Sequence, residues 1–201
     1  MKSILKLFAF SVIALSCTGR YDVNDLHVWI NDEENGLIKE RIIDDLKLTV
    51  KYLPPEVLAI KELDVEFEKA AFDSLVQVYS NQESFLISFE SRLENKDVVY
   101  KNVSDKEDYN RRIEQLSFRI GELISLKTSN DKISPSLFHY ERAYGTSKVN
   151  SVFLVFTDKS KKLLSAEKLD IVFVDEIFKT GISHFVFKRS DIQKIPSLNV
   201  R

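Results

Sequence analysis

The segment "KLDIVFVDEIFKTGISHFVFKRS", residues 168–190, sets the fold class of this chain. Two short runs rich in Val, Ile and Phe stand on either side of Lys179-Thr180-Gly181. A three-residue connection with a glycine that can take a positive φ angle is typical of a β-hairpin. A parallel α/β fold would need a helix between the two strands, and residues 169–188 leave no room for one. The segment therefore predicts two antiparallel strands.

Similar short runs occur upstream and predict further strands. Residues 46–53, "LKLTVKYL", and residues 84–92, "SFLISFESR", alternate apolar and polar side chains, as a strand with one buried face does. Residues 136–144, "SLFHYERAY", and residues 150–158, "NSVFLVFTD", are rich in β-branched and aromatic side chains. Residues 122–129, "ELISLKTS", also favour a strand. These patterns predict a mainly antiparallel sheet or a sandwich.

Three segments carry helix signals. Pro54 and Pro55 suit a turn that leads into the first position of a helix. Residues 65–80 place apolar side chains at helical spacing. The sequence "SDKE" at residues 104–107 matches a capping box with Ser104 as the N-cap, and an apolar stripe follows it. We therefore predict an α+β fold in which two or three helices accompany the sheet.

Composition supports one folded domain. The chain is 44% hydrophobic and 30% charged, with 14 Phe but only 5 Gly and 4 Pro, which is unlike a disordered chain. No internal repeat or low-complexity tract divides it. The net charge of −2 provides no basic patch, so nucleic acid is not an expected partner.

The first residues have the outline of a signal peptide. Lys2 and Lys6 precede a short apolar run that ends in "ALSC", with the single cysteine of the chain at Cys17. The run is shorter than the roughly 20 apolar residues that a membrane-spanning helix needs. A buried core helix would not require early lysines or a small residue before the cysteine. The pattern therefore predicts export.

The junction Ala14-Leu15-Ser16-Cys17 resembles the lipobox of bacterial lipoproteins. The resemblance implies that Cys17 is lipidated and becomes the first residue of the mature chain. Ala14 departs from the commonest pattern, which has Leu at that position. We divide the chain into a signal peptide at residues 1–16, a lipidated tether at residues 17–25 and a single globular domain at residues 26–201. The alternative is a free or buried cysteine after ordinary signal cleavage.

The relaxed lipobox and the segment after it resemble the small, uncharacterised envelope lipoproteins of Bacteroidota-type bacteria. That segment, residues 26–63, reads "LHVWINDEENGLIKERIIDDLKLTVKYLPPEVLAIKEL". The resemblance implies an outer-membrane location with the lipid on Cys17 as the anchor, and it supplies no active-site residues. In that class an acidic run after the cysteine directs the protein to the cell surface. Cys17 is followed by "TGRYDVND", so the resemblance favours the side that faces the periplasm.

The strongest candidate for chemistry is the pair His139 and Glu141. The two residues lie two apart on a predicted strand and therefore share a face, where they could begin a metal or acid–base site. The simpler interpretation is a solvated strand face. The remaining histidines, His27 and His184, are far away in sequence, and no pair of histidines has the spacing of zinc ligands.

Two groups of acids are further candidates. Asp170, Asp175 and Glu176 surround an apolar run, and paired carboxylates are what a glycosidase needs, but the end of a strand entering a turn explains them as well. Asp32-Glu33-Glu34 precede an Asn-Gly turn signal without the alternation of a calcium loop, so we interpret them as a solvated loop. Trp29 suits a core or lid position better than an exposed binding platform.

Two classes of function follow. The sequence lacks the motifs of serine hydrolases, P-loop enzymes, zincins and dinucleotide-binding enzymes. This favours a non-catalytic structural or accessory subunit of an envelope assembly, with an envelope protein as its partner and no cofactor or metal. The alternative is a lipid-anchored hydrolase or ligand-binding protein whose site is assembled from distant residues.

Overall fold

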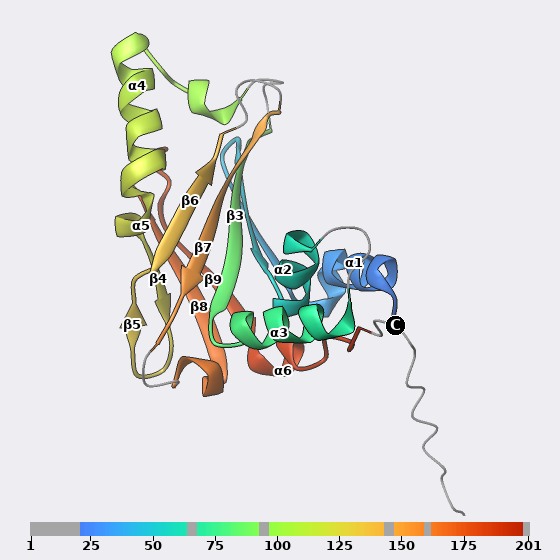
Figure 1. The fold of residues 1–201 in the computed structure, drawn as a ribbon. Helices are drawn as coiled ribbons and strands as arrows, with labels where there is room; N and C mark the ends of the chain where they lie inside the picture. Colours follow the sequence, from blue (N-terminus) through green and yellow to red (C-terminus); the bar gives the residue numbers. More distant parts are fainter. Residues whose placement is uncertain (1–20, 64–67, 93–96, 143–146, 159–161, 199–201) are drawn as a thin grey trace, which may run out of the picture.

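The computed structural model describes residues 21–63, 68–92, 97–142, 147–158 and 162–198. These residues form two antiparallel sheets that stack in a sandwich-like arrangement (Figure 1). One sheet has the strand order β1-β2-β3-β7-β6 and the other the order β5-β4-β8-β9. The α+β class and the dominance of antiparallel sheet are therefore confirmed.

Every strand predicted from the sequence is present. The strands are β1 (Ile38–Ile43), β2 (Leu46–Tyr52), β3 (Glu83–Ser91), β4 (Ile124–Lys127), β5 (Lys132–Ile133), β6 (Leu137–Glu141), β7 (Val149–Phe156), β8 (Lys168–Asp175) and β9 (Gly181–Lys188). The predicted hairpin joins β8 to β9, and Gly181 has a φ angle of 79°. Lys179 in the same loop also has a positive φ angle, 63°.

The predicted helices are present, and the structure adds others. The helices are α1 (Val23–Asn31), α2 (Pro55–Glu62), α3 (Lys69–Tyr79), α4 (Lys106–Glu114), α5 (Ile120–Leu123) and α6 (Arg189–Ile192), with a π-helical turn η3 (Gln115–Arg119) and 3₁₀ turns η1 (Glu33–Asn35), η2 (Val98–Tyr100) and η4 (Leu163–Ser165). Pro55 opens α2 at its first position, as predicted. Among the described helices, none combines the length and apolar character needed to cross a membrane.

The core lies between the two sheets and is rich in phenylalanine. Phe85 and Phe89 of β3 point inward because side chains alternate along a strand, and both are fully buried. The ring of Phe85 lies 5.2 Å from that of Phe187 in β9, and the ring of Phe89 lies 5.7 Å from that of Phe173 in β8. These contacts join the two sheets without disulfide bonds.

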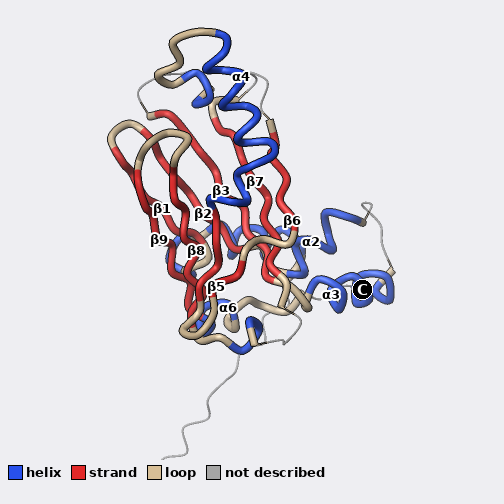
Figure 2. The backbone as a smooth tube through the Cα atoms, turned by 90° about the vertical axis from the view of Figure 1, so that its left-hand side faces the viewer, coloured by secondary structure: helices blue, strands red, loops and turns tan. Residues whose placement is uncertain are grey.

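The two sides of the sandwich are covered in different ways. On one side β1 faces β9, where the Arg41 guanidinium donates a hydrogen bond of 2.8 Å to the carbonyl of Ile182. Elsewhere the segment α4–η3–α5 runs beside β6 (Figure 2). Leu116 and Ile120 of this segment are fully buried. The edge of β9 is therefore partly covered by β1.

Because of helix α1, the folded domain begins at an earlier residue than we predict from the sequence. The Asp22 carboxylate accepts the amide of Asp25, and Asp25 accepts the amide of Asp22, which together form a capping box. Leu26 and Ile30 anchor the helix in the core. Residues 23–25, which we assigned to the tether, are therefore helical, and Tyr21 bridges to the C-terminal segment at residue 198.

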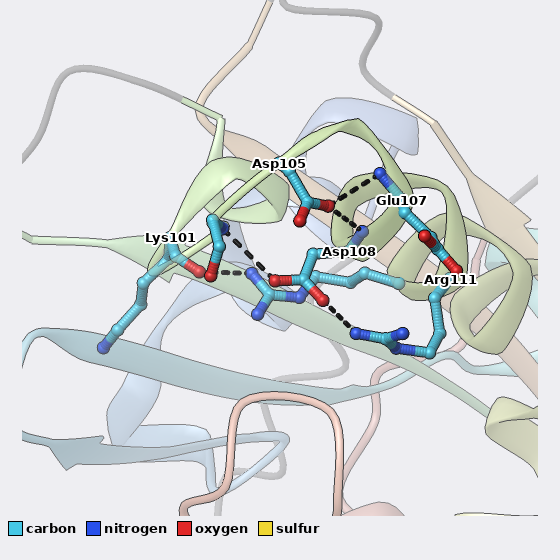
Figure 3. Close-up of polar contacts among 7 residues, drawn as sticks. Lys101, Asp105, Glu107, Asp108 and Arg111 are labelled. Atoms are coloured by element: carbon cyan, nitrogen blue, oxygen red, sulfur yellow. Dashed lines mark hydrogen bonds and ion pairs between the residues drawn. The ribbon is translucent and has the colours of Figure 1, made fainter.

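The N-cap of α4 is Asp105, one residue after the predicted Ser104. The Asp105 carboxylate accepts the amides of Glu107 and Asp108, each at 2.9 Å (Figure 3). Aspartate and serine are comparable caps, and two candidates stand side by side here. The apolar stripe that follows is nevertheless the predicted one.

Candidate functional site

Asp175 organises the β8–β9 hairpin loop. Its side chain is buried and accepts the amides of Ile177 at 3.0 Å, Phe178 at 2.8 Å and Thr180 at 3.1 Å, as well as the Thr180 hydroxyl. The adjacent Glu176 is exposed. These four hydrogen bonds of the Asp175 carboxylate hold the loop together, so the structure favours the turn interpretation over a pair of catalytic acids.

Asp170 has a different partner on the outer face of the same sheet. One of its carboxylate oxygens lies 2.8 Å from Nδ1 of His184, on the neighbouring strand β9. The other oxygen is buried without a hydrogen-bond partner. An aspartate that orients an imidazole is part of many catalytic sites. Ser125 of β4 lies on the same face and is opposite Val172 of β8 in the register. Val172 is in turn opposite His184 of β9, so strand β8 lies between Ser125 and His184.

Exposed apolar side chains lie on both sides of this pair. Val174, Ile182 and Val186 project from β8 and β9 with exposed fractions of 38%, 55% and 44%. Val174 and Ile182 are directly opposite each other in the strand register. We call Val174, Ile182, Val186 and the Asp170–His184 pair the β8–β9 face. Along β8 and β9 these exposed apolar residues alternate with buried apolar residues. Both faces of the two strands therefore carry apolar side chains.

Two lysines border the β8–β9 face at one end. Lys168 and Lys188 are opposite each other in the register and both are exposed. Within the described residues, neither lysine has a carboxylate at ion-pair distance. Like charges directly opposite on a sheet oppose pairing. This arrangement places two lysines beside exposed apolar surface, while Glu167 lines the same open pocket and Asp191 interacts electrostatically with Lys188.

The predicted pair His139 and Glu141 lies on the other sheet. Both side chains are exposed on the same face of β6, as their spacing required. Glu141 lines an open groove of about 600 Å³, whereas His139 does not. The groove lies between α2, α3 and strands β6 and β7, and its walls are Leu58, Lys61, Glu62, Tyr79, Gln82, Ser136, Leu137, Glu141, Phe153, Val155 and Thr157. The two residues share a face without meeting in one site.

The three histidines remain apart in the folded chain. His27 lies on α1 beside Asn31, His139 on β6 and His184 on β9, so they belong to three different surfaces. In the part of the chain that the structure describes, no group of three or more His, Cys, Asp or Glu side chains could hold a metal ion.

The acidic loop at residues 32–34 and Trp29 both make contacts that stabilise the local structure. Asp32 accepts the amide of Glu34 and caps the turn η1, and the three acids stay exposed. Trp29 is partly buried against the core, and its carbonyl accepts the side-chain amide of Asn35 at 2.9 Å. The predicted lipidation residue, Cys17, lies outside the described residues.

Comparisons with known proteins assign no family to this chain. No protein-family model matches the chain, and no curated protein matches it. One solved structure is similar over 88% of this chain and 91% of its own, with a TM-score of 0.39 and 11% identity. It is the crystal structure of a novel protein of unknown function from Burkholderia pseudomallei.

Proposed function

We propose that this protein is a lipid-anchored, non-catalytic accessory subunit of a bacterial envelope assembly, and that it binds its partner through the β8–β9 face. The observation that carries the proposal is the exposure of Val174 and Ile182, which are opposite each other in the register, and of Val186, which lies beyond His184 on the same face of β9. Exposed apolar side chains grouped on one surface among polar side chains mark many interaction sites.

The charges around the patch indicate the chemistry of the partner. Lys168 and Lys188 stand at one end of it and repel each other across the strands. A partner carboxylate placed between them would relieve that repulsion while apolar side chains cover Ile182 and Val186. The proposed partner is therefore an envelope protein with apolar side chains flanked by acids. Charge complementarity of this kind fixes orientation and excludes wrong partners.

The anchor is the lipid on Cys17, at the periplasmic side of the outer membrane. The support comes from the "ALSC" junction after an apolar run. Only residues 18–20 separate Cys17 from Tyr21, where the described chain begins. A four-residue span reaches at most about 14 Å when extended, so the domain would remain close to the membrane and to partners on it.

A charge on the β8–β9 face tests the docking proposal. The Ile182→Asp variant and a Val28→Asp variant would be isolated from detergent-solubilised membranes with cross-linked partners. Val28 is 74% exposed on α1, so it controls for adding a charge at an exposed valine elsewhere. We expect Ile182→Asp alone to lose the partner, because an unpaired charge in an apolar interface is costly.

Two further readouts make this experiment specific. The thermal midpoint of Ile182→Asp should stay within a few degrees of the wild type, because surface substitutions usually change stability by about 0.5 kcal/mol or less. The partner should carry acids at the cross-linked segment, and a Lys168→Glu, Lys188→Glu double variant should lose it. Equal recovery of the partner with Ile182→Asp and Val28→Asp would exclude this face.

A ligand-binding role is the second candidate, and the groove beside α2 and α3 supports it. Its volume of about 600 Å³ falls in the range of small-molecule sites, and Leu137, Phe153 and Val155 provide apolar walls. Leu137→Asp would remove binding of an apolar fluorescent probe if this groove were the site. The same variant should leave partner recovery unchanged if the β8–β9 face is the docking surface.

A further inference from the structure

A small basic pocket lies between the loop before α4 and the β8–β9 hairpin loop. Its volume is about 200 Å³, and it is lined by Lys101, Asn102, Arg112, Ile177, Phe178 and Lys179. Three of the six lining residues are cations and none is an acid, although the chain as a whole carries a net charge of −2. The excess of positive charge is therefore a local feature of this pocket.

Arg112 is the fixed centre of the pocket. Its Nη1 donates hydrogen bonds to the carbonyls of Val99, at 3.0 Å, and Lys101, and its guanidinium lies 5.3 Å from the centre of the Phe178 ring. These contacts hold the guanidinium plane in one orientation. Among the described residues these hydrogen bonds use only Nη1, so the other donors of the guanidinium remain to bind a ligand.

The charge of Arg112 has no direct counterion within the described residues. Two acids, Asp108 and Asp175, act on it electrostatically, but their direct partners are others: Asp108 pairs with Arg111 (Figure 3), and Asp175 accepts the amides of the hairpin loop. Burial lowers the pKa of Arg112, and these acids oppose part of the effect. An arginine stays protonated in proteins, so Arg112 carries a half-buried positive charge that these two acids offset only in part.

The other two cations have contrasting surroundings. Lys101 forms an ion pair with Asp45, which lowers the pKa of that carboxyl through the side-chain hydrogen bond. Lys179 is exposed and adopts a φ angle of 63°, a conformation that favours glycine. The Asp175 contacts hold the loop in this shape, so the backbone of Lys179 is strained at a position that lines the pocket.

We propose that this pocket binds a phosphate group, either as inorganic phosphate or on a small phosphomonoester. A guanidinium can hold two phosphate oxygens, and ammonium groups add point charges around the third. The pocket is smaller than the roughly 300 Å³ at which drug-sized ligands begin to fit, so the ligand is compact. The hairpin loop and α4 lie at the end of the strands away from α3 and α6 (Figure 1).

The test uses the full chain in a nonionic detergent and isothermal titration calorimetry with inorganic phosphate. Lys179→Gly removes one cation and suits the positive φ angle, so this variant should fold at least as well as the wild type. Its affinity for phosphate should fall about tenfold, as expected for the loss of one charge-assisted contact. Lys69→Ala removes an exposed lysine on α3 and should leave the affinity unchanged.

Two further titrations separate the sources of phosphate. Glycerol 3-phosphate should compete with inorganic phosphate, whereas the phosphodiester lipid dihexanoyl phosphatidylglycerol should not. Binding of the lipid alone, with the same dependence on Lys179, would replace the phosphomonoester by a lipid headgroup and overturn the proposal. Absence of phosphate binding, or equal weakening by Lys179→Gly and Lys69→Ala, would also overturn it.

Discussion

Asp175 shows how the surroundings of one carboxylate determine its role. In sequence it belongs, with Asp170 and Glu176, to a group of acids around an apolar run, and paired carboxylates are what a glycosidase needs. In the structure the Asp175 carboxylate accepts three loop amides and one hydroxyl, while Glu176 is exposed. A carboxylate that satisfies several buried donors stabilises a loop instead of reacting with a substrate.

The two acids should therefore differ sharply in their effect on stability. Asp175→Ala leaves the amides of Ile177 and Phe178 without their acceptor, and we expect a loss of about 2 kcal/mol in the free energy of unfolding. Glu176→Ala is the matched control and should change it by less than about 0.5 kcal/mol. Urea unfolding of both variants measures the difference. Similar values for the two variants would contradict the structural role of Asp175.

At the scale of an element, α4 shows that backbone geometry decides which of two neighbouring residues becomes the N-cap of a helix. Ser104 and Asp105 are both good N-caps by type, and either could precede the same apolar stripe. In the structure Asp105 has the extended backbone of an N-cap, with φ −155° and ψ −177°, and its carboxylate accepts two helix amides.

Substitution of the two residues distinguishes these caps. Asp105→Ala should destabilise the protein by about 1 kcal/mol, because it removes the acceptor of the amides of Glu107 and Asp108. Ser104→Ala should cost less than half as much. Thermal unfolding followed by circular dichroism provides the comparison, and a larger loss for Ser104→Ala would restore the cap predicted from the sequence.

At the scale of the whole molecule, the lipid on Cys17 is proposed to supply the membrane affinity. Cys17→Ala should move the protein from the membrane fraction to the soluble fraction, because a multiply acylated cysteine contributes nearly all of the anchoring. The wild type, but not the variant, should incorporate a labelled fatty acid. Retention of Cys17→Ala on membranes after a high-salt wash, with no label in the wild type, would contradict lipidation.

Much of the fold could be predicted because its signals are local. The alternation of β2 and β3 and the Gly181 connection each depend on neighbouring residues, so the strands and the hairpin were recognisable. Helix α1 was missed because only Leu26 and Ile30 provide its buried face and its capping box is made of two aspartates. Short elements with a narrow apolar face give weak patterns even when tertiary contacts stabilise them.

The candidate functional residues form contacts between strands, and the sequence does not show which residues of different strands come together. The spacing of His139 and Glu141 correctly put them on one strand face, but spacing says nothing of the third group that a site needs. Neither the contact of Asp170 with His184 nor the neighbouring exposed valines was foreseen. Alternation divides the residues of a strand between its two faces. When both faces carry apolar side chains, the sequence does not show which face is buried.

The sequence by itself determined the order of the strands along the chain, the antiparallel hairpin and the apolar core, since propensity and alternation act over a few residues. Only the tertiary structure decided which strands became neighbours and which charges met. Lys101, Arg112 and Lys179 come from two distant segments, and they line one pocket because the β8–β9 loop packs against the turn before α4. Contacts between residues so far apart depend on the packing of whole sheets, which no local pattern encodes.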